Sequence, residues 1–169
     1  SSIGSDAKGL NPIMSLQNRG AGLASERVLI IARTFDAPRD VVFDAWTKCE
    51  HVARWFGPKD FTVPHCNMDF RVGGTYRYCM LGPDGNEHWV SGTYKEIKKP
   101  EKLVFTWVRE DNDGRVWLDN VVTLTFTDRG AQTAFTLNQQ IFESIEERDA
   151  HNGGWSTCLD KLAEFVESR

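Results

Sequence analysis

The sequence predicts an α+β fold, in which a curved antiparallel β-sheet is wrapped around a long C-terminal helix. Three observations support this prediction. A β-branched run opens the densely patterned part of the chain, six more strand-like runs follow two short helical segments, and the C-terminal end changes to helical periodicity. The expected order is strand, helix, helix, six strands and long helix (β-α-α-β6-α). An antiparallel sheet needs cover on one face, and the last helix is the only predicted element large enough to provide it.

The first strand and two short helices are expected before residue 57. Residues 27–35 are rich in β-branched side chains, and the strand ends at Asp36-Ala37-Pro38. Pro38 suits the first position of a helix over 38–47, because its fixed φ is helical and no N–H is needed there; Asp36 or Ala37 is then near the cap. A second short helix is expected over 50–55, ending before Gly57-Pro58.

Six further strands are expected, each bounded by turn residues. Their ranges are 61–71, 76–81, 89–97, 102–109, 117–127 and 131–140. The segment Gly82-Pro83-Asp84-Gly85 has the composition of a hairpin turn, since Gly accepts a positive φ and Pro holds φ near about −65°. Short connections between successive strands indicate antiparallel pairing.

The C-terminal helix is predicted to begin near Ser144 and to present one apolar face. That face consists of Trp155, Cys158, Leu159, Leu162, Phe165 and Val166. Gly153-Gly154 inside the helix costs about 2 kcal/mol relative to two alanines. We therefore expect either a bend at the two glycines or a close approach of another segment to their backbone.

The N-terminal segment differs in composition from the rest of the chain. Residues 1–25 are rich in Ser, Gly and Asn and are expected to form a flexible tail, whereas 26–169 are expected to form one domain. Two alternatives are open for residues 1–13. Either they belong to the natural chain, or Met14 is the natural start and they are left from expression cloning.

Composition and charge exclude several functional classes. The 169 residues carry a formal charge of −4, which argues against general nucleic-acid binding. No apolar run is long enough for a membrane span, and no signal-peptide pattern opens the chain, so a cytoplasmic location is predicted. The four cysteines are expected to be free thiols in a reducing cytoplasm; these are Cys49, Cys66, Cys79 and Cys158. Neither the cysteines nor the four histidines have metal-site spacing, and no cofactor fingerprint is present, so neither a metal nor a cofactor is predicted.

A set of short motifs resembles one protein family. The motifs are Phe35-Asp36-Ala37-Pro38, Arg54-Trp55-Phe56-Gly57-Pro58, Asp69 with Arg71-Val72-Gly73-Gly74, Pro83-Asp84-Gly85, Gly92-Thr93-Tyr94, Leu103-Val104-Phe105-Thr106-Trp107, and His151 with Gly153-Gly154-Trp155. From about residue 26 to the end, the chain resembles the domain related to the activator of heat-shock protein 90 ATPase, in the START-like (SRPBCC) superfamily. The resemblance implies a helix-grip fold with a deep apolar cavity between sheet and helix. Wider relatives bind lipids, sterols or polyketides, and some act as cyclases. The eukaryotic activator also carries a separate N-terminal domain, for which this chain has no room.

The chain holds ten Phe, six Trp and three Tyr, which suggests either a heavily aromatic core or an aromatic-lined cavity. Together with the number of rings, the resemblance favours the cavity. Side chains alternate along a strand, so Tyr78 and Met80 share one face, and Phe105 and Trp107 share another. The expected ligand-contacting residues are Trp46, Trp55, Phe56, Tyr78, Met80, Phe105, Trp107, Phe126, Phe135, His151 and Trp155. The alternative is that these rings fill a solid core.

Three local features each allow a structural and a functional interpretation. In the segment 54–58, Trp55 and Phe56 either line the mouth of the cavity or fill the core. If the two rings are exposed, they would equally suit a homodimer contact. Asp69 and Arg71 favour a structural ion pair near the following turn. His151 is interpreted as a helix-surface histidine, and it is the only histidine we consider as a catalytic acid or base.

Three functions compete at this stage. The preferred one is a binding protein that holds an apolar or aromatic small molecule, lipid-like or polyketide-like, in the cavity. The second is a cyclase-like or hydrolase-like enzyme that uses the same cavity with residues such as His151, Tyr78 and Asp69. The third is regulation of a chaperone partner, which rests on the family resemblance alone.

Overall fold

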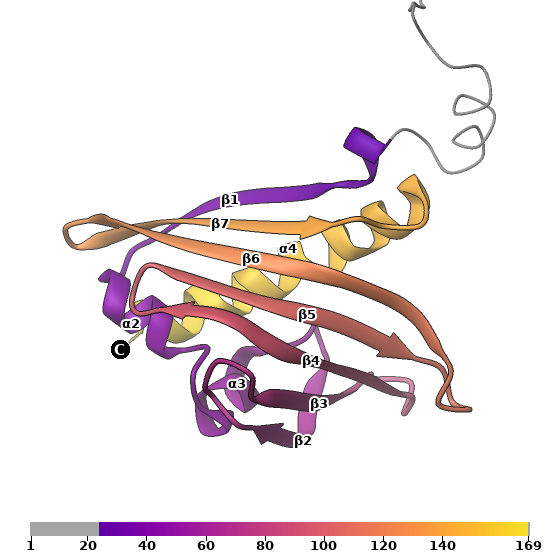
Figure 1. Cartoon of the computed structure of the whole chain (residues 1–169). Coiled ribbons are helices and arrows are strands. Elements are labelled where there is room, and N and C mark those ends of the chain that lie inside the picture. Colours follow the sequence, from indigo (N-terminus) through magenta and orange to yellow (C-terminus); the bar gives the residue numbers. More distant parts are fainter. Residues whose placement is uncertain (1–23, 169) are drawn as a thin grey trace, which may run out of the picture.

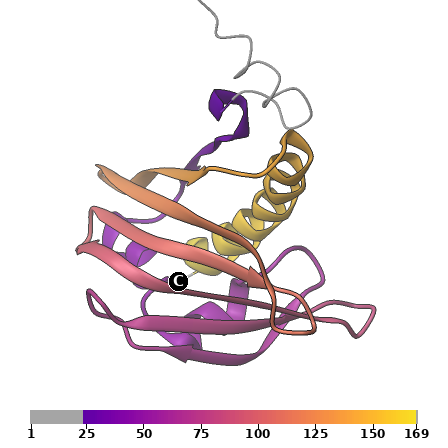
Figure 2. The same cartoon turned by 45° about the vertical axis from the view of Figure 1, so that its right-hand side comes forward.

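The computed structural model describes residues 24–168, and the expectations for residues 1–23 of the tail lie outside that range. All seven strands form one antiparallel sheet in the order β1-β7-β6-β5-β4-β3-β2. The long helix α4 runs across one face of this curved sheet (Figures 1 and 2). The predicted α+β helix-grip architecture and its element order are confirmed.

The strands follow the predicted pattern, with shifts of a few residues at their ends. They are β1 (Leu29–Phe35), β2 (Thr62–Met68), β3 (Thr75–Leu81), β4 (Glu87–Lys98), β5 (Lys102–Glu110), β6 (Val116–Arg129) and β7 (Gln132–Gln140). A short 3-10 turn, η1 (Ala24–Arg27), precedes β1. The expected hairpin turn joins β3 to β4, with Gly85 at a φ of 85°.

The two short helices are α2 (Arg39–Asp44) and α3 (Cys49–Trp55). Pro38 is the N-cap of α2 rather than its first helical residue, because its ψ of 155° is extended. Its carbonyl still accepts the first bonds of the helix, from the N–H groups of Val41 and Val42. The helix therefore starts one residue later than predicted.

Helix α4 (Ile145–Glu167) begins where the sequence predicted. The Ser144 hydroxyl accepts a hydrogen bond from the Glu147 N–H at 3.1 Å, and the Glu147 carboxylate accepts one from the Glu143 N–H at 3.3 Å. This reciprocal pairing resembles a capping box. The helix continues through Gly153 and Gly154, where a Cβ on Gly154 would lie 3.6 Å from the Pro58 ring. That distance is ordinary van der Waals contact, so Pro58 packs over the helix at Gly154 without requiring a glycine there.

One half of the space between sheet and helices is solid core. Phe126 on β6 packs against Phe43 of α2 at 5.2 Å and against Phe135 of β7 at 5.4 Å between ring centroids. Phe35 on β1 lies 5.3 Å from Phe135. All four rings are at most 1% exposed. The solid-core interpretation therefore applies to this half of the fold.

The prediction of four free thiols is wrong. Cys49 at the start of α3 and Cys66 on β2 form a disulfide, with their Cα atoms 5.7 Å apart, while Cys79 and Cys158 are buried thiols. The two bonded cysteines are 17 positions apart and belong to different elements, so no local sequence motif indicated that they would pair. The bond fastens α3 to the edge strand of the sheet.

Among residues 24–168, no helix combines the length and the apolarity that crossing a bilayer requires.

The disulfide is expected to stabilise the fold. Closing a loop of this length in the unfolded chain contributes about 3 kcal/mol. Denaturant unfolding with and without reductant should show a loss of about that size on reduction, and the double variant Cys49→Ser/Cys66→Ser should unfold identically in both conditions. Without reductant, thiol titration of the unfolded protein should detect Cys79 and Cys158 alone. Reaction of Cys49 and Cys66 under those conditions would contradict the pairing.

Candidate functional site: a pocket between the sheet and helix α4

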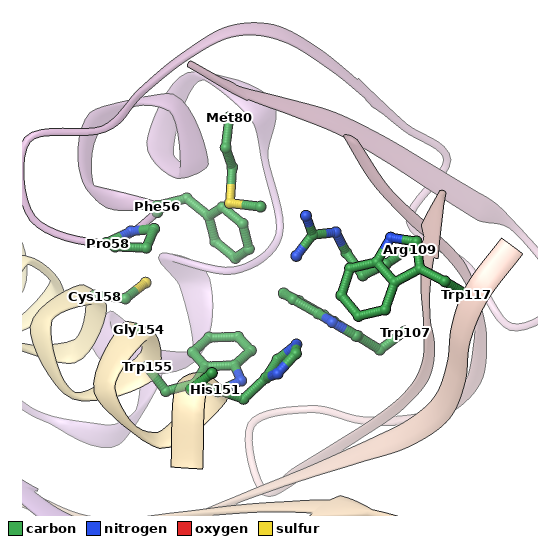
Figure 3. A pocket seen from close by; sticks show the side chains of 12 residues that line it. Phe56, Pro58, Met80, Trp107, Arg109, Trp117, His151, Gly154, Trp155 and Cys158 are labelled. Atoms are coloured by element: carbon green, nitrogen blue, oxygen red, sulfur yellow. The ribbon is translucent and has the colours of Figure 1, made fainter. Parts of the chain in front are cut away.

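A pocket of about 230 Å³ lies between the end of β5, helix α4 and the loop that follows α3. Figure 3 shows side chains from all three converging on it. Its lining consists of Phe56, Gly57, Pro58, Met80, Trp107, Arg109, Trp117, Ala150, His151, Gly154, Trp155 and Cys158. Most of this surface is apolar, and the pocket is partly open to solvent.

Three buried rings form the deep wall of the pocket. Trp107 and Trp155 lie 5.0 Å apart between ring centroids, and Phe56 lies 6.2 Å and 6.0 Å from them. Each is at most 4% exposed. Trp107 faces inward because it follows buried Phe105 by two residues on β5 and therefore lies on the same face, whereas Trp155 belongs to the apolar face of α4. The wall therefore joins a strand, a helix and a loop.

A chain of buried hydrogen bonds holds the Trp155 ring in place. Its indole N–H donates to Gln139 Oε1 at 2.8 Å, and the Gln139 amide donates in turn to Asn120 Oδ1 at 2.9 Å. Gln139 is fully buried and Asn120 is 5% exposed. Buried polar groups are costly unless paired, so this chain restricts Trp155 to one orientation.

Lys161 anchors the loop that carries Phe56. Its ammonium group lies 3.0–3.4 Å from the carbonyl oxygens of Phe56, Gly57, Pro58 and Phe61. The loop turns sharply here, since Gly57 has a φ of 96°. An ammonium group has three protons to donate, so it can bond three of these four carbonyls at one time. Partial burial lowers the pKa of Lys161.

His151 lines the pocket and is half-buried, which corrects its interpretation as a helix-surface histidine. Its Nδ1 lies 3.0 Å from the carbonyl oxygen of Glu147, one helical turn earlier. A carbonyl only accepts, so Nδ1 carries the proton and Nε2 of the neutral ring is an acceptor. Nε2 is buried and has no partner among the described residues. Burial lowers the pKa of His151, mainly by desolvation of the charged ring.

Arg109 is the cationic residue of the lining. Its Nε–H donates to the Trp89 carbonyl at 3.0 Å, and its guanidinium lies 5.1 Å from the centre of the Trp117 ring. No carboxylate within residues 24–168 lies within ion-pair distance of it. Trp117 is 40% exposed and Arg109 is half-buried, so these two residues form the rim of the pocket.

The structure divides the sequence-predicted site residues into three groups. Phe56, Met80, Trp107, His151 and Trp155 line the pocket. Trp46, Tyr78 and Phe105 instead border a separate void of about 10 Å³, too small for a ligand, because neighbouring tyrosines fill that region. The members of the third group do not line either space and belong to the core; they are Trp55, Phe126 and Phe135.

Trp55 and Phe56 take different roles although they are adjacent. Trp55 is fully buried and donates its indole N–H to the Ala45 carbonyl at 3.1 Å, so it fills the core. Phe56 begins the turn after α3 and reaches the pocket. Both rings are buried, so neither is available for the homodimer contact that exposure would have allowed.

Sequence reasoning missed Arg109 and Trp117. Phe105, Trp107 and Arg109 occupy every second position of one strand, so the sequence pattern could have placed Arg109 on the inner face with the two rings. The sequence pattern did not indicate Trp117, because neighbouring residues of a strand point to opposite faces and Leu118 points inward. In the structure, Arg109 pairs with Leu118 whereas Glu110 pairs with Val116, which makes Trp117 the extra residue of a β-bulge. Bulges re-aim side chains, and this one brings Trp117 to the pocket rim.

The three candidates for acid–base chemistry lie in three different environments. Asp69 forms the expected ion pair with Arg71 at 2.8 Å on the surface, Tyr78 borders the small void, and His151 lines the pocket. Burial raises the pKa of Tyr78 well above 10. Within residues 24–168 no three of the His, Cys, Asp and Glu side chains are grouped in a way that could hold a metal ion.

Comparisons with known proteins agree with this architecture. A family model described as Activator of Hsp90 ATPase homolog 1-like protein matches residues 36–167. A structure from Chromobacterium violaceum is 25% identical, with a TM-score of 0.74 over 83% of this chain and 97% of that chain. An AHSA1 protein from Silicibacter pomeroyi is also 25% identical, with a TM-score of 0.73 and coverages of 81% and 95%. A solution structure from Arthrobacter aurescens is 23% identical, with a TM-score of 0.75 and coverages of 89% and 91%. A comparison with the curated proteins gave no match.

Lys161→Met should destabilise the protein by about 1–3 kcal/mol, because the loop carbonyls lose a charged donor while the aliphatic part of the side chain is kept. Urea unfolding measures this change. Lys102→Met is the matched control, since the one ion pair of Lys102 within residues 24–168 is with Glu96 at 3.5 Å on the surface, and such pairs contribute little. Equal stability of the two variants would contradict the anchoring role.

Stability should depend on pH through His151. Its pKa in the fold is below the 6.5 of an unperturbed histidine, so the unfolded chain takes up a proton first as the pH falls. The free energy of unfolding therefore decreases as the pH falls below about 6.5. His151→Gln should show a smaller decrease than the wild type in urea unfolding between about pH 7.5 and pH 5. An unchanged pH dependence in this variant would show that His151 does not contribute.

Proposed function

The chain belongs to the Activator of Hsp90 ATPase homolog 1-like family, and on this premise we propose that it is a small-molecule-binding protein. The ligand is aromatic and largely apolar, and it occupies the pocket between the sheet and α4. The observation that carries this proposal is the deep wall of Phe56, Trp107 and Trp155 around an open volume. Aromatic rings pack against such walls in offset or edge-to-face geometry.

The size of the pocket narrows the ligand class. A cavity of about 150 Å³ accepts one benzene molecule, so the 230 Å³ of this pocket suit a substituted ring or two fused rings. Sites for drug-sized ligands are larger, about 300–1,000 Å³. A compact aromatic molecule therefore fits better than a sterol or a multi-ring polyketide.

Two buried polar atoms in the lining residues would suit a ligand that also carries polar groups. Trp107 Nε1 is a donor and His151 Nε2 is an acceptor, and neither has a partner among the described residues. Buried polar groups are nearly always paired in folded proteins. A ligand oxygen near Trp107 and a ligand hydroxyl near His151 would satisfy both atoms after small side-chain rotations.

Ligand binding is favoured over the two alternative functions. A cyclase-like or hydrolase-like reaction needs an acid–base pair within hydrogen-bond reach, and Asp69, Tyr78 and His151 lie in three different environments. Chaperone regulation is suggested by the family description, whereas the pocket itself argues for a small ligand.

Two adjacent glycines on α4 allow a sharp test. Gly154 lines the pocket, so the side chain of Gly154→Met must enter it; Gly153 does not line it, and a Cβ there would meet no atom within 4 Å. Both changes remove a helical glycine and should raise helix stability similarly, by about 0.5–1 kcal/mol. They therefore differ chiefly in the pocket volume.

We expect 2-naphthol to quench the Trp fluorescence of the wild type saturably. Gly154→Met should weaken its binding about tenfold or more, equivalent to about 1.4 kcal/mol, while Gly153→Met should bind as the wild type does. Native mass spectrometry gives the stoichiometry. Equal binding by the two variants would place the ligand elsewhere, and no saturable binding to the wild type would argue against the proposed function.

A further inference from the structure

We propose that the ligand is an aromatic carboxylate, whose ring system packs against the deep aromatic wall and whose carboxylate binds Arg109. This inference rests on the proposed function, because it concerns the same pocket and specifies the chemical class of its ligand. It assigns the polar end of the ligand to the rim and its apolar end to the interior. Three observations on Arg109 carry it: its position, its unused donors and the charges around it.

The position of Arg109 is set by the alternation of β5. Phe105, Trp107 and Arg109 occupy every second position, so the guanidinium is on the same face as the two buried rings. Figure 3 shows it projecting between Phe56 and Trp117 toward the open volume. A cation placed at the edge of an apolar pocket is suited to the charged end of an amphipathic ligand.

The guanidinium keeps most of its hydrogen-bonding capacity. One hydrogen bond from Arg109 is recorded among the described residues, from Nε–H to the Trp89 carbonyl at 3.0 Å. This bond fixes the orientation of the group and leaves both Nη atoms as donors. Two parallel N–H groups match the two oxygens of a carboxylate. Trp117 stacks on the guanidinium at 5.1 Å and so limits its rotation.

The charges around Arg109 favour an anion. Among the titratable groups of the pocket lining, His151 and Cys158 are neutral at pH 7, since burial lowers the pKa of His151 and raises that of Cys158 to about 12. His88 on β4 also lies within electrostatic range, and its pKa is lowered by burial and by Arg109. The lining contains no carboxylate. An anionic ligand would therefore supply the countercharge that the described residues do not.

Arg77 is a second arginine of this sheet that stacks on a tryptophan, and its contacts indicate a structural role. Its guanidinium lies 4.2 Å from the Trp89 ring. Unlike Arg109, it lies 3.9 Å from a carboxylate, that of Glu110, and it does not line the pocket. Arg77 alternates with inward-facing Tyr76 and Tyr78, so it belongs to the opposite face. It is the matched control for Arg109.

The test compares 2-naphthoate with 2-naphthamide, which have nearly the same shape and differ in charge. The wild type should bind the carboxylate about tenfold or more tightly than the amide, because charge-assisted hydrogen bonds are about twice as strong as neutral ones. Arg109→Gln should abolish this preference and leave amide affinity within about twofold. Arg77→Gln should keep the wild-type preference. Fluorescence titration measures both ligands on all three proteins.

The outcomes separate this inference from the proposed function. Equal affinities of the wild type for naphthoate and naphthamide would overturn the role of Arg109 and leave aromatic binding intact. Failure of both compounds to bind would contradict the inference and the proposed function together. Retention of the preference in Arg109→Gln would overturn the assignment to this residue. The wild-type comparison needs no variant, so it remains decisive if Arg109→Gln does not fold.

Discussion

The packing of Trp155 is the interaction on which the arrangement of this protein depends. Its ring lies 5.0 Å from Trp107 of β5, 6.0 Å from Phe56 and 6.2 Å from Trp46, and its indole N–H is held by Gln139 of β7. One side chain of α4 thereby contacts the sheet and the segments around α3. Each aromatic pair adds about 0.5–1.5 kcal/mol beyond area burial, so together they outweigh the one hydrogen bond, whose role is to set the orientation.

The same helix also builds the wall opposite the sheet. Six residues after Trp155, Lys161 donates hydrogen bonds to the carbonyls of the loop that starts at Phe56. Thr157 accepts a hydrogen bond from the Lys59 N–H at 3.0 Å. Pro58 packs over Gly154, where an added Cβ would lie 3.6 Å from the proline ring. The pocket is therefore bounded by elements that α4 itself holds in position, and a shift of this helix would change its volume.

Polarity changes along the pocket in a way that suits an amphipathic ligand. Phe56, Trp107 and Trp155 are nearly inaccessible to solvent, whereas Trp117 is 40% exposed and Arg109 lies beside it. Desolvating a charge in the interior is costly, while a guanidinium at the rim retains part of its hydration until a ligand arrives. The structure therefore separates an apolar interior from a cationic edge within one small volume.

The sequence by itself determined the order of the elements and the direction in which many side chains face. Alternation along β5 placed Phe105 and Trp107 inward, helical spacing placed Trp155 on the buried face of α4, and Ser144 marked the helix start. These patterns are local, since they depend on the geometry of a few consecutive residues.

Only the tertiary structure decided which inward-facing residues meet solid core and which meet open space. Phe126 and Phe135 face inward like Trp107, yet they pack against Phe35 and Phe43 and do not reach the pocket. The register shift that re-aims Trp117 and the meeting of Cys49 with Cys66 likewise depend on pairing between separate elements. Such outcomes follow from strand register, sheet curvature and helix placement. All three are set by contacts between residues that are far apart in the sequence. The local pattern of side chains carries no information about such contacts.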